Sequence, residues 1–233
     1  MRIIFRIFAA YMGARKLQKF AEFDSSPHSL DMNHETKGKW NTYFKNENPI
    51  VLELACGKGD YTVNLAEKFP DKNFIGIDIK GSRLWRGCKT IAERGLKNAA
   101  FLRIYIDTIE NYFEKGEVSE IWITFPDPQP KKARKRLTHP KFLNSYLPLL
   151  NGNGSVNLKT DSDLMYEFTK EVVAQNELSV LEDIPNVYEQ EEINELMQIQ
   201  TYYEKMWLAE GRTIKFISFQ LNKETNYLKP ELE

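Results

Sequence analysis

Cysteine and histidine are scarce in this chain of 233 residues, which contains two cysteines and three histidines. The two cysteines, Cys56 and Cys88, cannot build a disulfide framework of the kind that holds small secreted domains together. A closed zinc site would need nearly all of the cysteines and histidines, so no metal is expected. Low cysteine usage is typical of a reducing compartment, so we expect a cytoplasmic protein. We expect it to be a monomer or a homodimer.

Long apolar runs are lacking as well. No window of the sequence approaches the roughly 18 consecutive apolar residues of a transmembrane helix, so no membrane association is expected. The one stretch that resembles a targeting segment is residues 1–10, where Arg6 interrupts the apolar run and basic residues follow. Three interpretations stay open for it: a signal peptide, an upstream start with Met12 as the natural first residue, or an amphipathic arm.

Neither sign of charge is in excess. Lys and Arg together number 32, Asp and Glu together number 33, and the formal net charge is -1. This balance excludes a uniformly basic nucleic-acid-binding protein and an acidic disordered chain. Any surface of this protein that binds anions must therefore be local.

Regular structure is predicted from Pro49 onward, whereas residues 1–45 carry no sustained period and are expected to form a flexible or loosely docked basic arm. Apolar runs predict strands over residues 50–54, 73–77, 99–104, 120–124, 155–158, 178–181 and 213–221. Helical patterns cover residues 61–69, 82–94, 140–150 and 163–175, with a short helical segment at 109–113. Strands that alternate with helices pair in parallel through right-handed crossovers. The sequence therefore predicts one α/β domain over residues 46–233, with an open, mostly parallel, Rossmann-like sheet and helices on both faces.

Acidic residues stand at or just beyond the ends of four predicted strands: Glu53, Asp78, Asp107 and Asp127. In open α/β sheets the ligand lies beyond the carboxyl ends of the strands, so we expect these acids to share one edge. Each of them alone could equally be a solvated acid at a strand end.

The first of these strands ends in a glycine turn that contains Gly57 and Gly59 and is followed by Asp60. A dinucleotide site has a third glycine and a helix N-terminus that is free to bind pyrophosphate. Asp60 would repel pyrophosphate, but it suits a cofactor that carries a positive amino acid group and a sulfonium. Asp78 could accept hydrogen bonds from ribose hydroxyls. The two glycines could also do no more than permit a tight turn.

The segment from Thr124 to Leu137, TFPDPQPKKARKRL, is the most informative part of the chain. Two prolines restrict the backbone on both sides of Asp127, so its side chain loses little entropy when a ligand binds. Five of the six residues from Lys131 onward are basic. Such a cluster can hold a phosphate backbone next to the predicted active edge, although a charge run is often only solvated surface.

At this point the sequence resembles the bacterial tRNA (guanine-N7)-methyltransferases of the TrmB type, which modify guanine 46 in the variable loop. The resemblance covers nearly the whole chain after Met12. It rests on MGARKL from Met12, LELACGKG from Leu52, GIDI from Gly76, the segment from Phe125 to Leu137, Thr160-Asp161, and TYYE from Thr201. The resemblance implies a class I methyltransferase fold, S-adenosyl-L-methionine as cofactor and tRNA as partner.

Site residues follow from the resemblance position by position. It implies cofactor contacts for the glycine turn and the four strand-end acids, namely Glu53, Gly57, Gly59, Asp78, Asp107 and Asp127. The resemblance also implies that Asp127 is the catalytic residue. The tRNA contacts expected from the resemblance and from the charge pattern are Lys131, Lys132, Arg134, Lys135, Arg136, Asp161, Thr201, Tyr203 and Glu204.

Two positions depart from the family pattern. Ala55 stands where the family usually has a glycine, and it is harmless there only if its φ is ordinary. Gln129 replaces a tryptophan, which removes a possible aromatic platform for the base.

The role expected for Asp127 is electrostatic, because guanine N7 has a free lone pair and needs no base before it attacks a methyl group. Asp161, Thr201 and Glu204 could bind the polar edge of guanine. Alternatives for two of them stay open, an N-cap role for Asp161 and a helix-surface role for Glu204.

Three other functions are weaker matches to the sequence. An RNA-binding protein that has lost turnover would not need the intact strand-end acids. A methyltransferase that acts on exocyclic amines usually has a motif like Asn/Asp-Pro-Pro-Tyr, which differs from the FPDP found here at Phe125–Pro128. A nicotinamide dehydrogenase would need the third glycine.

Overall fold

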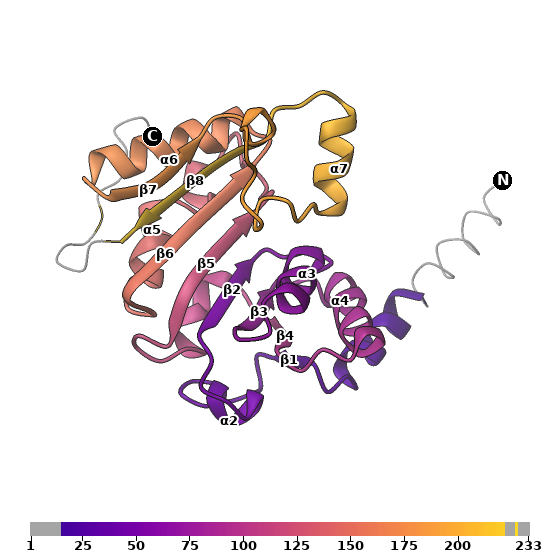
Figure 1. Ribbon diagram of the computed structural model, residues 1–233. Coiled ribbons are helices and arrows are strands. Elements are labelled where there is room, and N and C mark those ends of the chain that lie inside the picture. Colours follow the sequence, from indigo (N-terminus) through magenta and orange to yellow (C-terminus); the bar gives the residue numbers. More distant parts are fainter. Residues whose placement is uncertain (1–14, 222–226, 228–233) are drawn as a thin grey trace.

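The computed structural model describes residues 15–221 and Tyr227, apart from the side chain of Asn153. Their core is an eight-stranded sheet with the strand order β1-β4-β3-β2-β5-β6-β8-β7 (Figure 1). The strands are β1 (Ser29–Asp31), β2 (Ile50–Leu54), β3 (Asn73–Ile77), β4 (Ala99–Arg103), β5 (Val118–Thr124), β6 (Leu150–Thr160), β7 (Ser179–Ile184) and β8 (Lys215–Gln220).

The six strands from β1 to β6 pair in parallel, and β8 pairs antiparallel with both β6 and β7. The strand order reverses at β2, which lies between β3 and β5, so the switch point falls beside the glycine turn that follows β2. The predicted class, an open and mostly parallel Rossmann-like sheet, is confirmed.

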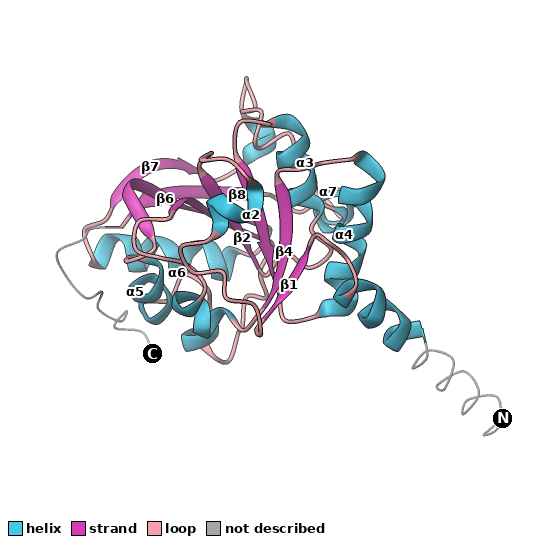
Figure 2. Ribbon diagram, turned by 90° about the horizontal axis from the view of Figure 1, so that it is seen from below, coloured by secondary structure: helices cyan, strands magenta, loops and turns pink. Residues whose placement is uncertain are grey.

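Helices cover both faces of the sheet, as predicted (Figure 2). The α-helices are α2 (Trp40–Phe44), α3 (Asp60–Lys68), α4 (Gly81–Arg94), α5 (Pro140–Tyr146), α6 (Asp163–Gln175) and α7 (Tyr202–Ala209). Residues 15–24 are also helical. Short 3-10 helices are η1 (Ile106–Asn111), η2 (Ala133–Lys135) and η3 (Val187–Glu189).

Two apolar layers hold the helices against the sheet. Alternate residues of β2 point to opposite faces: Leu52 packs with α2, α5 and α6, whereas Val51 packs with α3 and α4. All five residues of β2 are buried, as expected for a strand covered on both faces. The segment between β7 and α7 joins the second layer through Val187 and Met197.

The expected arm does not extend to residue 45. β1 pairs with β4 at the edge of the sheet, and Phe23, Leu30, Trp40 and Phe44 are buried. The indole of Trp40 stacks on Phe113 and donates a hydrogen bond to the carbonyl of Tyr112. The prediction of a loosely docked segment is therefore wrong for β1 and α2, which are part of the domain; residues 1–14 lie outside the described residues.

Within the part of the chain that the structure describes, the search for a helix long and apolar enough to cross a membrane finds none.

Candidate active site

The four predicted acids lie just beyond, or near the end of, neighbouring strands on one edge of the sheet. Glu53 is in β2 and Asp78 follows β3 directly. Asp107 is in η1, which follows β4, and Asp127 is in the loop that follows β5. Because these strands are parallel neighbours in the sheet, their ends bring the four acids to a common edge.

The glycine turn after β2 is fastened to the end of β3. The backbone N–H of Gly57 donates to Asp78 Oδ2 at 3.1 Å, and the N–H of Lys80 donates to Asp78 Oδ1 at 2.8 Å. Gly59 is required at the start of α3: its φ is +73°, and a Cβ there would come within 2.1 Å of the ring of Phe101. The sequence therefore uses Gly59 both for backbone conformation and for close packing.

Ala55 does not have the ordinary φ that would make it harmless. Its φ is +57°, in the left-handed region where a side chain costs about 1 kcal/mol or more. This left-handed conformation explains why the family usually has a glycine here. In this chain Ala55 adopts the same conformation at that energetic cost.

Glu53 is sealed inside the domain, with 3% of its surface exposed. Its carboxylate accepts hydrogen bonds from the Thr62 N–H at 2.8 Å, from the Thr62 hydroxyl, and from the Thr124 hydroxyl at 2.6 Å. Burial raises the pKa of Glu53 to about 7, against the opposing effect of these hydrogen bonds. Glu53 therefore links the start of α3 to the end of β5, and it supports the site from beneath.

A cavity of about 320 Å³ lies over the ends of β3 and β4, and we call it the Asp78 cavity. Both Asp78 and Asp107 line it, and Asp107 also pairs with Lys141. The apolar part of its wall comes from Ala55, Ile79, Ile104, Ile106, Leu137 and Phe142. Gln129 lines this cavity too. The tryptophan that the family usually has at this position would therefore line the Asp78 cavity.

A larger cavity of about 800 Å³ adjoins the β5 and β6 ends, and we call it the Asp127 cavity. Asp127 is exposed on its wall and accepts a hydrogen bond from the Gln129 N–H at 3.0 Å. Phe125 and Gln129, on either side, have φ of +49° and +46°. Strained backbone of this kind is found where a loop must hold a functional group in one place.

Helix α7 supplies an aromatic wall to the Asp127 cavity that the sequence did not reveal in full. The rings of Tyr203 and Trp207, one helical turn apart, stack with centroids 6.5 Å apart, and both line the cavity. The guanidinium of Arg212 lies 3.9 Å from the Trp207 ring. Trp207, Arg212, Lys80 and Arg83 line the cavity without having been predicted. In the sequence, the only sign of this aromatic wall was the four-residue spacing of Tyr203 and Trp207.

Asp161 also lines the Asp127 cavity, but it does not cap α6. Ser162 is the N-cap residue of that helix, with its hydroxyl accepting from the Met165 N–H, so the alternative N-cap role for Asp161 is wrong. Asp161 instead pairs with Arg212 at 2.8 Å. This ion pair joins the end of β6 to the segment that follows α7.

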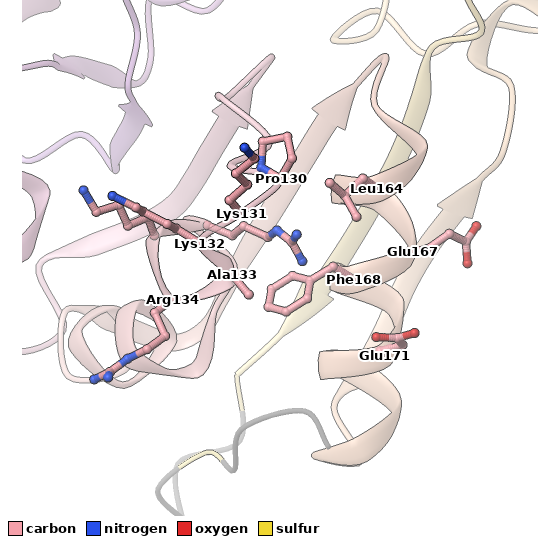
Figure 3. Close-up of a pocket in the computed structure, with 11 residues that line it drawn as sticks. Pro130, Lys131, Lys132, Ala133, Arg134, Leu164, Glu167, Phe168 and Glu171 are labelled. Carbon is pink, nitrogen blue, oxygen red and sulfur yellow. The ribbon is translucent and has the colours of Figure 1, made fainter. Parts of the chain in front are cut away.

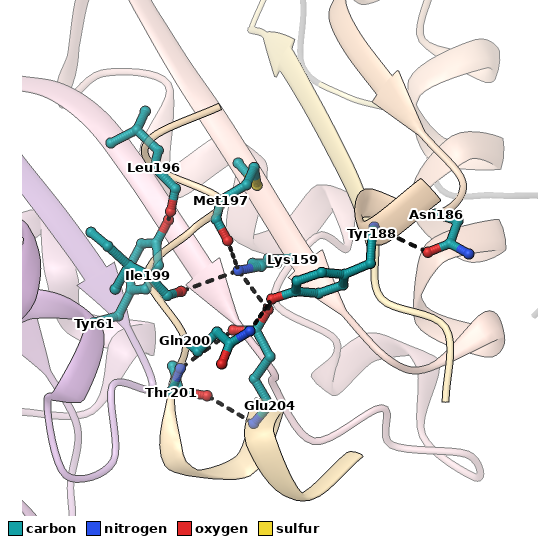
Figure 4. Close-up of polar contacts among 10 residues, drawn as sticks. All are labelled: Tyr61, Lys159, Asn186, Tyr188, Leu196, Met197, Ile199, Gln200, Thr201 and Glu204. Carbon is teal, nitrogen blue, oxygen red and sulfur yellow. Dashed lines mark hydrogen bonds and ion pairs between the residues drawn. The ribbon is translucent and has the colours of Figure 1, made fainter. Parts of the chain in front are cut away.

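Thr201 and Glu204, at the start of helix α7, are buried, and Figure 4 shows their polar contacts. They form a capping box, in which the Glu204 N–H donates to Thr201 Oγ1 at 3.1 Å and the Thr201 N–H donates to Glu204 Oε2 at 3.3 Å. Glu204 also pairs with Lys159, and burial lowers the pKa of that lysine. Neither Thr201 nor Glu204 lines the Asp127 cavity, where their expected guanine contacts would have to be made. The helix-surface alternative for Glu204 is wrong, because its side chain is buried.

The basic segment from Lys131 to Arg136 forms one side of a third hollow of about 760 Å³, opposite α6 (Figure 3). Lys131, Lys132, Arg134 and Lys135 are exposed. Arg136 is buried instead: its Nε donates to the Pro128 carbonyl at 3.0 Å, and its guanidinium lies 4.5 Å from the Phe168 ring. The phosphate contact expected of Arg136 does not fit this position, since the residue anchors the loop.

Known proteins resemble this chain at the level of both sequence and fold. The family described as "Putative methyltransferase" matches residues 47–217. The tRNA (guanine-N(7)-)-methyltransferase of Bacteroides fragilis (strain YCH46) is 46% identical over 231 residues, with 95% of this chain and 92% of the relative covered. That of Porphyromonas gingivalis (strain ATCC BAA-308 / W83) is 50% identical over 200 residues, covering 84% and 82%.

Solved structures share the fold at much lower identity. The 16S rRNA methyltransferase KamB superposes with a TM-score of 0.61 at 12% identity, with 84% of this chain and 95% of that chain covered. The aminoglycoside resistance methyltransferase NpmB1 gives 0.56 at 14% identity, covering 80% and 93%. These likenesses establish the class I methyltransferase fold alone. The sequence relatives go further, and the chain belongs to the bacterial tRNA (guanine-N7)-methyltransferase family.

Proposed function

We propose that this protein is a cytoplasmic enzyme that transfers the methyl group of S-adenosyl-L-methionine to N7 of guanine 46 in the variable loop of tRNA. The observation that carries the proposal is the placement of Asp127. Its carboxylate stands on the wall of a cavity lined by Tyr203 and Trp207, and the same loop reaches the Asp78 cavity through Gln129. A base and a cofactor can therefore meet at this loop.

The Asp78 cavity fits the adenosine part of the cofactor. Asp78 can accept hydrogen bonds from ribose hydroxyls in addition to those it receives from Gly57 and Lys80. Asp107 can accept from an exocyclic amine, and Ile79 and Ile106 offer apolar surface to a purine. The turn that contains Gly57 and Gly59 would hold the amino acid end, with Glu53 supporting the turn from within.

The cofactor would supply a methyl group bound to a positively charged sulfur. The rest of the cofactor would leave as a neutral thioether. Guanine N7 already carries a lone pair on its exposed major-groove edge, so no residue has to remove a proton first. As the new N–C bond forms and the C–S bond breaks, positive charge moves to the purine. Asp127 can stabilise that charge, and its restricted loop holds the carboxylate ready before the reaction begins.

Guanine recognition is assigned to Asp161 and the aromatic wall of the same cavity. A carboxylate can accept hydrogen bonds from guanine N1 and N2, which adenine does not offer in the same pattern. Tyr203, 42% exposed, gives a base a face on which to stack. This supplies the aromatic platform that Gln129 cannot.

Phosphate binding is assigned to the four exposed cations of the basic segment: Lys131, Lys132, Arg134 and Lys135. Glu167 and Glu171 of α6 line the same hollow as this segment, across from it (Figure 3). The four cations would therefore bind phosphate on their solvent-facing side, away from these two acids.

Replacing Lys131, Lys132 and Lys135 together by alanine is expected to weaken tRNA binding and to flatten its salt dependence. Each lost phosphate contact should reduce the slope of log K against log salt by about 0.7 to 0.9. Titration of tRNA binding at several salt concentrations measures this slope. A matched control removes the same charge from exposed lysines before β2, β4 and β5, at the other edge of the sheet: Lys45, Lys97 and Lys115. Equal slopes for the two triple variants would contradict the assignment.

The proposed activity is tested by incubating the protein with unmodified tRNA and methyl-labelled cofactor, and then mapping the label by nuclease digestion and mass spectrometry. We expect 7-methylguanosine at a single position of the variable loop. A tRNA with 7-deazaguanine at that position lacks the attacking nitrogen and should stay unlabelled. Label on another atom or nucleotide would overturn the assignment, and binding of tRNA without any label would favour an inactive RNA-binding protein.

A further inference from the structure

A completely buried ion pair joins β6 to the first turn of α7 (Figure 4). The side chains of Lys159 and Glu204 are both 0% exposed, with Nζ and Oε1 2.6 Å apart. The Lys159 ammonium also donates to the Met197 and Ile199 carbonyls at 2.9 and 3.2 Å. Glu204 Oε1 accepts a further hydrogen bond from the Tyr188 hydroxyl at 2.8 Å. The donors of Lys159 and the oxygens of Glu204 are thus occupied within the protein.

Taking two charges out of water is costly, and a buried ion pair is weak evidence for stability. A pair that is kept in spite of this cost often fixes one arrangement against its alternatives.

Lys159 contacts both the loop that carries Asp127 and the helix that carries Tyr203. It lies in β6 opposite Thr124 of β5, and its carbonyl accepts a hydrogen bond at 2.8 Å from the N–H of Phe125, where the Asp127 loop begins. Its ammonium holds Glu204 in the first turn of α7. One residue therefore joins the loop that carries Asp127 to the helix that carries Tyr203.

The start of α7 has a second attachment, on the cofactor side. The Tyr202 N–H donates to Asp60 Oδ2 at 3.3 Å, and the Lys58 ammonium lies 4.2 Å from the Tyr202 ring. Lys58 belongs to the glycine turn, and Asp60 is the first residue of α3. Lys159 and this attachment together leave α7 little freedom to shift relative to either cavity.

We propose that Lys159 and Glu204 are positioning residues for methyl transfer, which set the aromatic wall of α7 against Asp127, and that Glu204 acts from inside the protein without touching guanine. The inference rests on the proposed function, and it assigns a role to a lysine that the mechanism above does not use. A small displacement of α7 would move Tyr203 and Trp207 relative to the carboxylate and misalign the base.

The test compares Glu204→Gln, Lys159→Met and the double variant Lys159→Met/Glu204→Gln in single-turnover methyl transfer with saturating cofactor and tRNA. Each single change leaves one buried charge without its partner, and we expect each to lower the rate by about 30-fold or more. The double variant is uncharged and keeps a glutamine that can complete the capping box. We expect its rate to recover to within about 5-fold of wild type, whereas cofactor affinity stays unchanged in all three.

The single variant Glu204→Gln and the double variant carry the same glutamine in place of Glu204, which makes the comparison decisive. If Glu204 bound guanine directly, the double variant would be as slow as Glu204→Gln, and the positioning role would be overturned. Trp40→Phe, at a residue that lines neither cavity, controls for lost stability. It removes the hydrogen bond to the Tyr112 carbonyl and should unfold more easily without loss of rate. A wild-type protein that methylates no tRNA would instead overturn the proposed function, and this inference with it.

Discussion

Replacing Asp127 by asparagine is expected to slow methyl transfer about 100-fold in a single turnover with saturating cofactor and tRNA. Asparagine keeps an oxygen that can accept the hydrogen bond from the Gln129 N–H, so the loop is expected to stay in place. The change removes only the negative charge that faces the purine as it becomes positive. The affinities for cofactor and tRNA should each change by no more than about 5-fold, because the interaction is strongest in the transition state.

A matched control for this change is Asp71→Asn. Asp71 is likewise exposed beside a proline, but it lies in the turn between α3 and β3, at the opposite edge of the sheet. Its replacement should leave the rate unchanged. Full single-turnover activity of the Asp127 variant would show that the carboxylate does not stabilise the transition state, and in-line alignment alone would then have to account for the rate.

The central strands and helices could be predicted from sequence because their signals are local. Short, mostly apolar runs mark β2, which follows Pro49, and β3, which begins at Asn73 and ends before Asp78. The helical pattern of α6 gives its bounds without error. β1 was missed because three residues show no period, and its pairing with β4 depends on residues about 70 positions away. α2 was missed for a similar reason, since one turn of helix is held in place mainly by the packing of Trp40.

The rim of the site was predictable, but its interior was not. The positions of Asp78, Asp107 and Asp127 follow from strand ends in a parallel sheet, and the structure brings them to one edge. The resemblance implied a substrate contact for Glu204, and nothing in the charge pattern distinguishes an exposed acid from a buried one at that position. Its partner Lys159 lies 45 positions earlier, in a strand that carries no other charged residue. Only the pairing of β6 with the elements around it reveals why that strand carries a lysine.

Glu53→Gln is expected to remove a pH dependence from the stability of the domain. Burial raises the pKa of Glu53 from 4.5 to about 7, so the folded protein holds this proton more tightly than the unfolded chain. The stabilisation from that proton is fully present below pH 4.5 and is lost as the pH rises through 7. Over this window the wild type should lose on the order of 3 kcal/mol relative to the glutamine variant, which resembles the protonated side chain.

Denaturant unfolding of both proteins at pH 4.5, 5.5, 6.5 and 7.5 measures the difference in the free energy of unfolding. The difference should grow with pH in favour of Glu53→Gln and level off above pH 7, because the wild-type carboxylate is then charged in both states. A difference that stays constant over the range would mean that Thr62 and Thr124 stabilise the charged form enough to cancel the cost of burial. In that case Glu53 would be a permanent negative charge beneath the glycine turn, able to attract the positive end of the cofactor through it.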